Sequence, residues 1–244
     1  MREWIATDLD GTLFSRGWAA DDAIPATWRS DPSTGARIAS SWMPSSIHRA
    51  MMLLQLHCAI VPVTARDAES FARVAIDRIP LSGPAVIANG ALVYDLYGRL
   101  DSDWLAEMTH RLYPWRGWME AALVHLSVRC AGHARARLVE GPAGLPAYLV
   151  AKAPGGWWQS ENGTQIRETL NLDGVHLSVL GDELQILPPG VGKAEALRMV
   201  MDVYFDGSKP LFCFGDMPGD LAFMRIGRIL TTPRNSHLDK AWPD

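Results

Sequence analysis

Short apolar segments alternate with amphipathic stretches along this chain, and that alternation restricts the folds it can adopt. The apolar segments predict buried strands at residues 4–7, 59–63, 85–88 and 211–214. Helical periodicity predicts helices at residues 46–57, 68–79 and 191–204. Strands that alternate with helices favour an α/β protein with a parallel sheet over a helical bundle or a β-sandwich.

The segment 89–187 has a different texture from the rest of the chain. Two helical stretches flank Pro114, and further strands are expected at residues 137–139, 148–150, 175–180 and 183–187. We therefore predict a Rossmann-like parallel-sheet core made of residues 1–88 and 188–244, with residues 89–187 inserted as a smaller α/β cap domain. The segment 18–42 is rich in Trp, Ser and Pro, and we expect a surface loop there, with a lid as the alternative.

Composition and charge exclude several classes of protein. Of the 244 residues, 48% are hydrophobic and 20% are charged, which is enough apolar material for a core and excludes intrinsic disorder. The net charge of −4 offers no basic field, so we expect no nucleic-acid partner.

The cysteine pattern and the apolar runs bear on the compartment. Three widely spaced cysteines without a CxxC pair indicate neither a disulfide framework nor a zinc site. The N-terminal residues lack the apolar region of a signal peptide, and no apolar run approaches the roughly 18 residues that span a bilayer. We expect a cytoplasmic protein without a membrane partner, while the sequence does not indicate its oligomeric state.

Two carboxylates follow the first predicted strand. Asp8 and Asp10 stand two residues apart, directly before Gly11. Ligands of open α/β sheets bind beyond the carboxyl ends of the strands, so this position is typical of a site. Carboxylates this close repel each other unless a cation or a proton is shared between them. Taken alone, the motif slightly favours a solvated turn over a site.

Further chemically active residues recur at strand ends and helix starts. Thr64 ends the second predicted strand, Lys193 opens a helix, and Asp216 and Asp220 follow the last predicted strand. Each has a simpler interpretation, as a helix cap, a surface lysine or a loop. The occurrence of all of them in this order nevertheless predicts one shared site.

These residues resemble the motifs of the haloacid dehalogenase (HAD) superfamily of phosphohydrolases. The resemblance is to the branch with an α/β cap between the second and third motifs, which includes sucrose-phosphate phosphatase-like and Cof-like proteins. The matching segments are Asp8-Leu9-Asp10-Gly11-Thr12-Leu13, Thr64-Ala65-Arg66, Asn89-Gly90-Ala91, Lys193, Gly215-Asp216 and Asp220. Two positions depart from the family pattern: Ala65 stands where many members have Gly, and Gly219 where many have Asn.

The resemblance implies a role for each matching residue. Asp8 would be the nucleophile, Asp10 the proton donor and then acceptor, and Lys193 the group that neutralises charge in the transition state. The residues implied for phosphate or substrate binding are Thr64, Ala65, Arg66 and Asn89. The residues implied for a magnesium (Mg²⁺) site are Asp8, Asp10 through its main-chain carbonyl, Asp216, and Asp220, the last by orienting a metal-bound water or Lys193.

The expected function is therefore that of a phosphoric monoester hydrolase. We expect a Mg²⁺-dependent phosphatase that acts on a small phosphorylated metabolite, a sugar phosphate in particular, through an aspartyl-phosphate intermediate. Family ATPases carry Thr in place of Asp10, so that residue favours a phosphatase or a phosphomutase. A phosphomannomutase-like enzyme is the first alternative, and an inactive binding protein on the same fold is the second, because Gly219 removes a polar side chain from the fourth motif.

Overall fold

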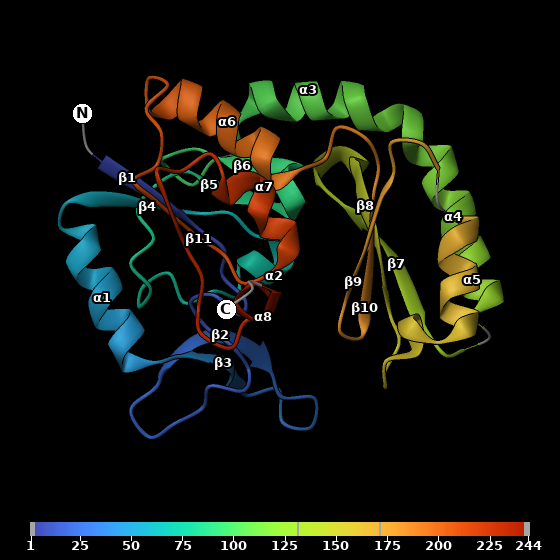
Figure 1. Cartoon of the computed structure of the whole chain (residues 1–244), viewed down its shortest axis with the longest axis horizontal. Coiled ribbons are helices and arrows are strands. Elements are labelled where there is room, and N and C mark those ends of the chain that lie inside the picture. The colour runs from blue at the N-terminus through green and yellow to red at the C-terminus, as the bar shows by residue number, and fades with distance from the viewer. Residues whose placement is uncertain (1–2, 131, 171, 242–244) are drawn as a thin grey trace. The chain divides into compact units, whose positions relative to one another are not determined.

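The computed structural model describes residues 3–130, 132–170 and 172–241. They divide into two compact units, of which the first comprises Met1–Asp101 and Lys193–Asp244 and the second Ser102–Gly192. The strands of the first unit are β1 (Glu3–Thr7), β2 (Ile24–Ser30), β3 (Arg37–Met43), β4 (Cys58–Pro62), β5 (Ala85–Ile87), β6 (Leu92–Tyr94), β11 (Phe212–Phe214) and β12 (Ile229–Thr231) (Figure 1). Its helices are α1 (Ser45–Gln55), α2 (Ala68–Phe71), α6 (Lys193–Tyr204), α7 (Leu221–Met224) and α8 (His237–Ala241).

A parallel four-stranded sheet in the order β12-β11-β1-β4 forms the centre of the first unit. Its inner strand β1 is fully buried at Trp4, Ile5 and Ala6, as expected for a strand covered on both faces. The ring of Trp4 stacks on Phe205 with 4.2 Å between the ring centroids, and the Trp4 indole donates to the Ser208 carbonyl. These contacts fix the end of α6 and the following turn against the sheet.

The structure confirms the predicted fold class, an α/β protein with a parallel-sheet core and an inserted smaller α/β unit. The strands expected in the core are β1, β4, β5 and β11. Strand β5 ends at Ile87 rather than Ala88, because Ala88 has φ +51°, in the left-handed region that no strand adopts.

The helix expected at residues 68–79 is wrong beyond its first turn. Helix α2 ends at Phe71, and the backbone of the next residues pairs with β2 instead. Trp28 donates its amide to the Arg73 carbonyl, and the Ala75 amide donates to the Ala26 carbonyl. The Arg73 carbonyl and the Ala75 amide are thus satisfied by another segment, and this outweighs the helical periodicity.

The segment 18–42, expected to be a surface loop, contains a β-hairpin. Its strands β2 and β3 pair antiparallel from Ile24↔Met43 to Ser30↔Arg37. The Thr27 hydroxyl lies 2.6 Å from that of Ser41, and both side chains are buried. The hairpin therefore belongs to the packed body of the first unit.

The second unit is a two-layer α/β structure. Its strands β7 (Arg135–Glu140), β8 (Pro146–Lys152), β10 (Glu183–Leu187) and β9 (His176–Leu180) form an antiparallel sheet in that order, and its helices are α3 (Ser102–Leu112), α4 (Arg116–Arg129) and α5 (Glu161–Thr169). The hairpin β9–β10 confirms the predicted one. Alternate strand residues pack with α4 and α5 in a buried cluster that contains Met119, Ala122, Leu126, Leu149, Ala151, Trp158, Ile166, Leu184 and Ile186.

The division into units lies at other positions than the predicted domain boundaries of 89 and 187. Residues 89–101 pack with the first unit, because β6 pairs with β5 and the Asp101 amide donates to the Val93 carbonyl. The Tyr204 hydroxyl of α6 also donates to Asp101, at 2.5 Å. The insertion therefore begins after Asp101 and ends immediately before Lys193.

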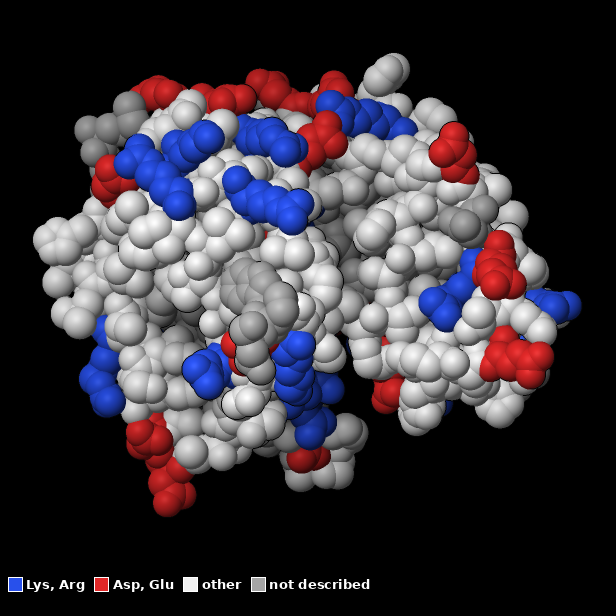
Figure 2. Space-filling view, in the orientation of Figure 1, with Lys and Arg blue, Asp and Glu red and all other residues white. Residues whose placement is uncertain are grey.

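The surface and the helices give two further observations. Among the described residues, the structure contains no helix that is long and apolar enough to cross a membrane. On the face drawn in Figure 2, the described acidic and basic side chains are interspersed in small groups, without a continuous basic field.

Candidate active site

The order of the strands brings the two acidic motifs together. Asp8 directly follows β1, and its amide donates to the Phe214 carbonyl of β11 at 2.9 Å. Asp216 lies two residues beyond β11, so both carboxyl groups lie at the carboxyl edge of adjacent parallel strands. Both side chains are buried, with Asp8 5% exposed and Asp216 7%.

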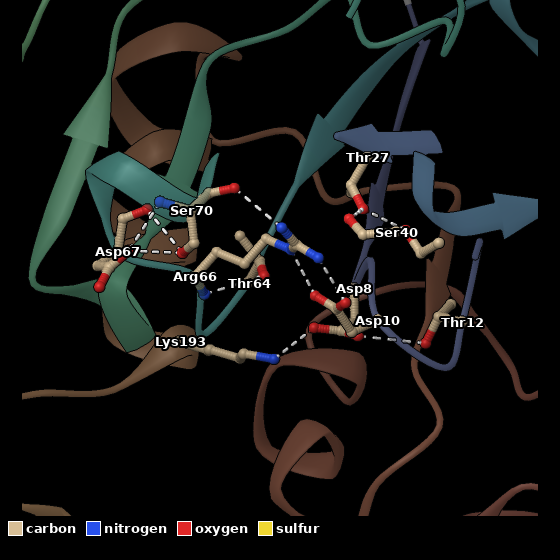
Figure 3. A network of polar contacts seen from close by, with 11 residues as sticks. Asp8, Asp10, Thr12, Thr27, Ser40, Thr64, Arg66, Asp67, Ser70 and Lys193 are labelled. Carbon is tan, nitrogen blue, oxygen red and sulfur yellow. Dashed lines mark hydrogen bonds and ion pairs between the residues drawn. The ribbon is translucent and has the colours of Figure 1, made fainter. Parts of the chain in front are cut away.

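Lys193 is the cation of this cluster. It is the first residue of α6, and its Nζ lies 2.6 Å from Asp8 Oδ1 and 2.8 Å from Asp220 Oδ1 (Figure 3 draws the pair with Asp8). The other oxygen of Asp220 accepts the backbone amides of Asp216 and Met217. Asp220 therefore holds both the lysine and the loop that carries Asp216.

Burial and charge shift the proton equilibria in this cluster. Burial raises the pKa of Asp8 well above its usual value, although the Lys193 ammonium opposes the shift. Burial and then the neighbouring Asp220 raise the pKa of Asp216 to about 6. Burial would lower the pKa of Lys193, but the Asp8 and Asp220 carboxylates together raise it above its usual value.

The acidic residues of the cluster are arranged as a metal site would require. Asp8, Asp216 and Asp220 each offer a carboxylate oxygen, and these oxygens lie within 4.8 Å of one another. Three buried carboxylates face one ammonium group, so the cluster has an excess of negative charge when all are ionised. Clustered carboxylate oxygens are the donors preferred by hard divalent cations such as Mg²⁺.

Two further residues of the first motif, Gly11 and Thr12, lie against the carboxyl groups of the cluster. Gly11 has φ +85°, and a Cβ atom there would lie 2.3 Å from Asp216 Oδ2, so only glycine fits. The buried Thr12 hydroxyl lies 3.2 Å from Asp216 Oδ1 and 3.4 Å from Asp8 Oδ2. Thr12 was not among the predicted site residues. Its position within the first motif was the available signal.

The Asp10 side chain lies apart from this cluster. Its carboxylate is 53% exposed and forms a two-pronged ion pair with Arg66, with Nε 2.6 Å from Oδ2 and Nη2 2.7 Å from Oδ1 (Figure 3). The group of described residues whose side chains could hold a metal ion does not contain Asp10. The predicted contribution of Asp10 to the metal site is its main-chain carbonyl, and the position of its side chain does not test that prediction.

Solved structures resemble this chain, whereas no family model and no curated protein matches its sequence. The C-terminal domain of trehalose-6-phosphate phosphatase from C. albicans has a TM-score of 0.62 and 14% identity over 92% of this chain and 73% of that one. The sucrose-phosphatase from Synechocystis has a TM-score of 0.55 and 14% identity over 98% and 95%. A haloacid dehalogenase-like hydrolase from Bacteroides thetaiotaomicron has a TM-score of 0.57 and 12% identity over 95% and 94%. The chain has the haloacid dehalogenase fold.

The second motif of this haloacid dehalogenase fold lies next to the first. Val63 donates its amide to the Thr7 carbonyl. Asp8 and Thr64 therefore lie just beyond the ends of the neighbouring strands β1 and β4. Thr64 is buried, and its carbonyl accepts the amide of Asn89 at 3.1 Å. The structure thereby joins the loop of Thr64, Ala65 and Arg66 to the Asn89 loop.

The departure at Gly219 leaves open space in the fourth motif. A Cβ atom at Gly219 would meet no heavy atom within 4 Å, whereas one at Gly215 would lie 2.7 Å from the Asp220 Cβ. Glycine is therefore required by packing at position 215 and not at position 219.

Proposed function

We propose that this protein is a Mg²⁺-dependent phosphatase that hydrolyses a small sugar phosphate through an aspartyl-phosphate intermediate. The observation that carries the proposal is the buried cluster of Asp8, Lys193, Asp216 and Asp220 at the carboxyl edge of the parallel sheet, with the exposed Asp10 carboxylate two residues from Asp8. The trehalose-6-phosphate phosphatase domain and the sucrose-phosphatase, solved in complex with sucrose and phosphate, have the same fold and support the choice of a sugar phosphate.

The residues present fit a divalent cation. Asp8, Asp216 and Asp220 would hold Mg²⁺, because their oxygens converge and their charge exceeds that of Lys193. Bound there, Mg²⁺ would offset the charge of the phosphate group and so permit a carboxylate to approach it.

The first half-reaction uses Asp8 and Asp10. A carboxylate oxygen of Asp8 forms a bond to phosphorus while the bond from phosphorus to the leaving oxygen breaks. Asp10, in its protonated form, gives its proton to that oxygen, and the alcohol leaves. Lys193, in contact with Asp8, stabilises the negative charge that spreads over the phosphoryl oxygens.

The second half-reaction restores the enzyme. Asp10, now a carboxylate, takes a proton from water while the water oxygen bonds to phosphorus. The bond from phosphorus to Asp8 breaks, which releases inorganic phosphate and the Asp8 carboxylate. Thr64 and Asn89 are proposed to hold phosphate oxygens during both steps.

The second unit is proposed to act as a cap that selects the substrate. Its chain enters from Asp101 and returns directly into Lys193, the first residue of α6. The insertion is therefore linked through the chain to a residue of the site, and we propose that its closure excludes water.

Phosphate release from a panel of sugar phosphates tests the proposal. The wild-type protein should release phosphate with Mg²⁺ and not in excess chelator, and Asp8→Asn should abolish release. Asp21→Asn serves as the control, because Asp21 is an exposed aspartate of the same unit. Absence of release from every member of the panel, or equal activity of Asp8→Asn, would refute the proposal. A requirement for a sugar bisphosphate activator would indicate a mutase instead.

A further inference from the structure

Arg66 holds both oxygens of the Asp10 carboxylate. Its Nε and Nη2 groups donate to Oδ2 and Oδ1 at 2.6 and 2.7 Å, so the guanidinium forms two hydrogen bonds side by side with the carboxylate (Figure 3). This two-pronged geometry restricts the orientation of the carboxylate as well as its distance.

The guanidinium group is itself anchored on its other side. Its Nη1 donates to the Ser70 carbonyl at 2.8 Å, and the Ser70 amide and hydroxyl both donate to Asp67 Oδ1, which caps α2. The guanidinium carbon lies 5.3 Å from the centre of the Phe14 ring. The Arg66 side chain is only 17% exposed, whereas that of Asp10 is 53% exposed.

Arg66 has more partners and is less exposed than Asp10, so Arg66 holds Asp10 in place rather than the reverse. A partly buried group with partners on three sides keeps its place, and the more exposed carboxylate is positioned by that group. An isolated surface carboxylate samples several rotamers, but proton transfer requires it within hydrogen-bond reach of the leaving oxygen and of water.

We propose that Arg66 is a positioning residue for Asp10 and not a phosphate ligand, an inference that rests on the phosphatase function proposed above. Arg66 directs Nε, Nη1 and Nη2 to Asp10 and Ser70, so it acts on the reaction by fixing the carboxyl group that delivers and removes the proton. The helix cap at Asp67 belongs to the same support, because it fixes the Ser70 carbonyl.

The first test is the dependence on the leaving group. Arg66→Met frees the Asp10 carboxyl group, and a misplacement of about 1 Å can cost about 10²-fold in rate. We expect a loss in kcat/KM, which reports the first half-reaction, of about 10–10²-fold for a sugar phosphate and a much smaller loss for 4-nitrophenyl phosphate, whose leaving group hardly needs a proton. Arg66→Lys keeps the charge without the fork and should recover only part of the rate.

The second test combines Arg66→Met with Asp10→Asn, which removes the proton transfer. If Arg66 acts through Asp10, adding Arg66→Met to Asp10→Asn should change the rate less than twofold. A loss in the Asp10→Asn background as large as in the wild type would overturn the proposal.

A binding measurement judges the proposal without turnover. Calorimetric titration with inorganic phosphate in the presence of Mg²⁺ should give affinities within twofold for the wild type and Arg66→Met. A tenfold weaker affinity of Arg66→Met would identify Arg66 as a phosphate ligand and refute the positioning role. A wild-type protein without phosphatase activity would refute the proposed function, while this titration would still show whether Arg66 is a phosphate ligand.

Arg99→Met is the matched control for these variants. Arg99 also pairs with an aspartate of the first unit, with its Nε 3.0 Å and its Nη2 2.9 Å from Asp95 Oδ2, and its side chain is 72% exposed. Loss of this pair should leave the turnover of both substrates unchanged. Thermal unfolding of each variant shows that a reduced rate does not come from a misfolded chain.

Discussion

Replacement of Lys193 by methionine should destabilise the protein strongly when no metal is present. The variant keeps the length of the side chain and removes the ammonium between Asp8 and Asp220, whose oxygens lie 2.6 and 2.8 Å from Nζ. At an effective dielectric constant of about 20, each of these pairs attracts by about 6 kcal/mol before desolvation is counted. Since removal of one partner of a buried pair typically costs about 3–5 kcal/mol, we expect a loss of that size.

The loss should depend on pH and on Mg²⁺. Without Lys193, the pKa of Asp8 in the folded protein rises further above its unfolded value, so the folded variant binds a proton more readily than the unfolded one. The destabilisation is therefore largest at alkaline pH and declines as the pH falls toward the usual range of a carboxyl group. A divalent cation that binds the three carboxylates should restore part of the stability.

Chemical unfolding in chelator at pH 5 and pH 8, with and without Mg²⁺, measures these effects. A loss of about 3–5 kcal/mol corresponds to a decrease in Tm of about 6–20 °C for a chain of this size. Lys209→Met is the control, because Lys209 is an exposed lysine of the same unit and its loss should change little. Equal stability of the two variants at pH 8 in chelator would refute the electrostatic account of the cluster.

Three further predictions concern the same site. Gly11→Ala should lower the free energy of unfolding by about 2–5 kcal/mol, because the new Cβ meets Asp216 at a positive φ. Gly219→Ala places its Cβ in open space and should leave the free energy of unfolding unchanged or raise it by up to ~1 kcal/mol. Equal effects of the two variants in chemical unfolding would contradict the packing argument. The apparent Mg²⁺ affinity should fall below pH 6, by up to about tenfold per pH unit, because Mg²⁺ must displace the proton of Asp216, whose pKa is raised to about 6 by burial; calorimetry that shows a flat affinity from pH 5 to 7 would exclude this coupling. Activity lost in chelator should return with Mg²⁺ and only poorly with Ca²⁺, because Ca²⁺ takes more ligands at longer distances; equal rates with the two ions would exclude the assigned geometry.

The sequence by itself determines the elements that depend on patterns among neighbouring residues. The apolar run before Asp8 predicts β1, the amphipathic period after Gly192 predicts α6, and Gly181-Asp182 between two apolar runs predicts the hairpin β9–β10. In each case the element is decided by the periodicity and the turn residues of a short segment, which a sequence displays directly. The proximity of Asp8 and Asp216 could also be expected, because both follow strands of one parallel sheet. The roles assigned to these residues stay predictions.

Pairings between distant segments were decided only by the tertiary structure. Residues 72–79 have a helical pattern, but the Arg73 carbonyl and the Ala75 amide bond to the hairpin strand β2 instead, and no local pattern indicates that pairing. The ion pair of Arg66 with Asp10 joins side chains on two different loops, and it depends on the path of each loop after its strand. Strand order and loop path follow from the packing of the whole unit. The ion pair between Arg66 and Asp10 can therefore be identified only from the folded structure.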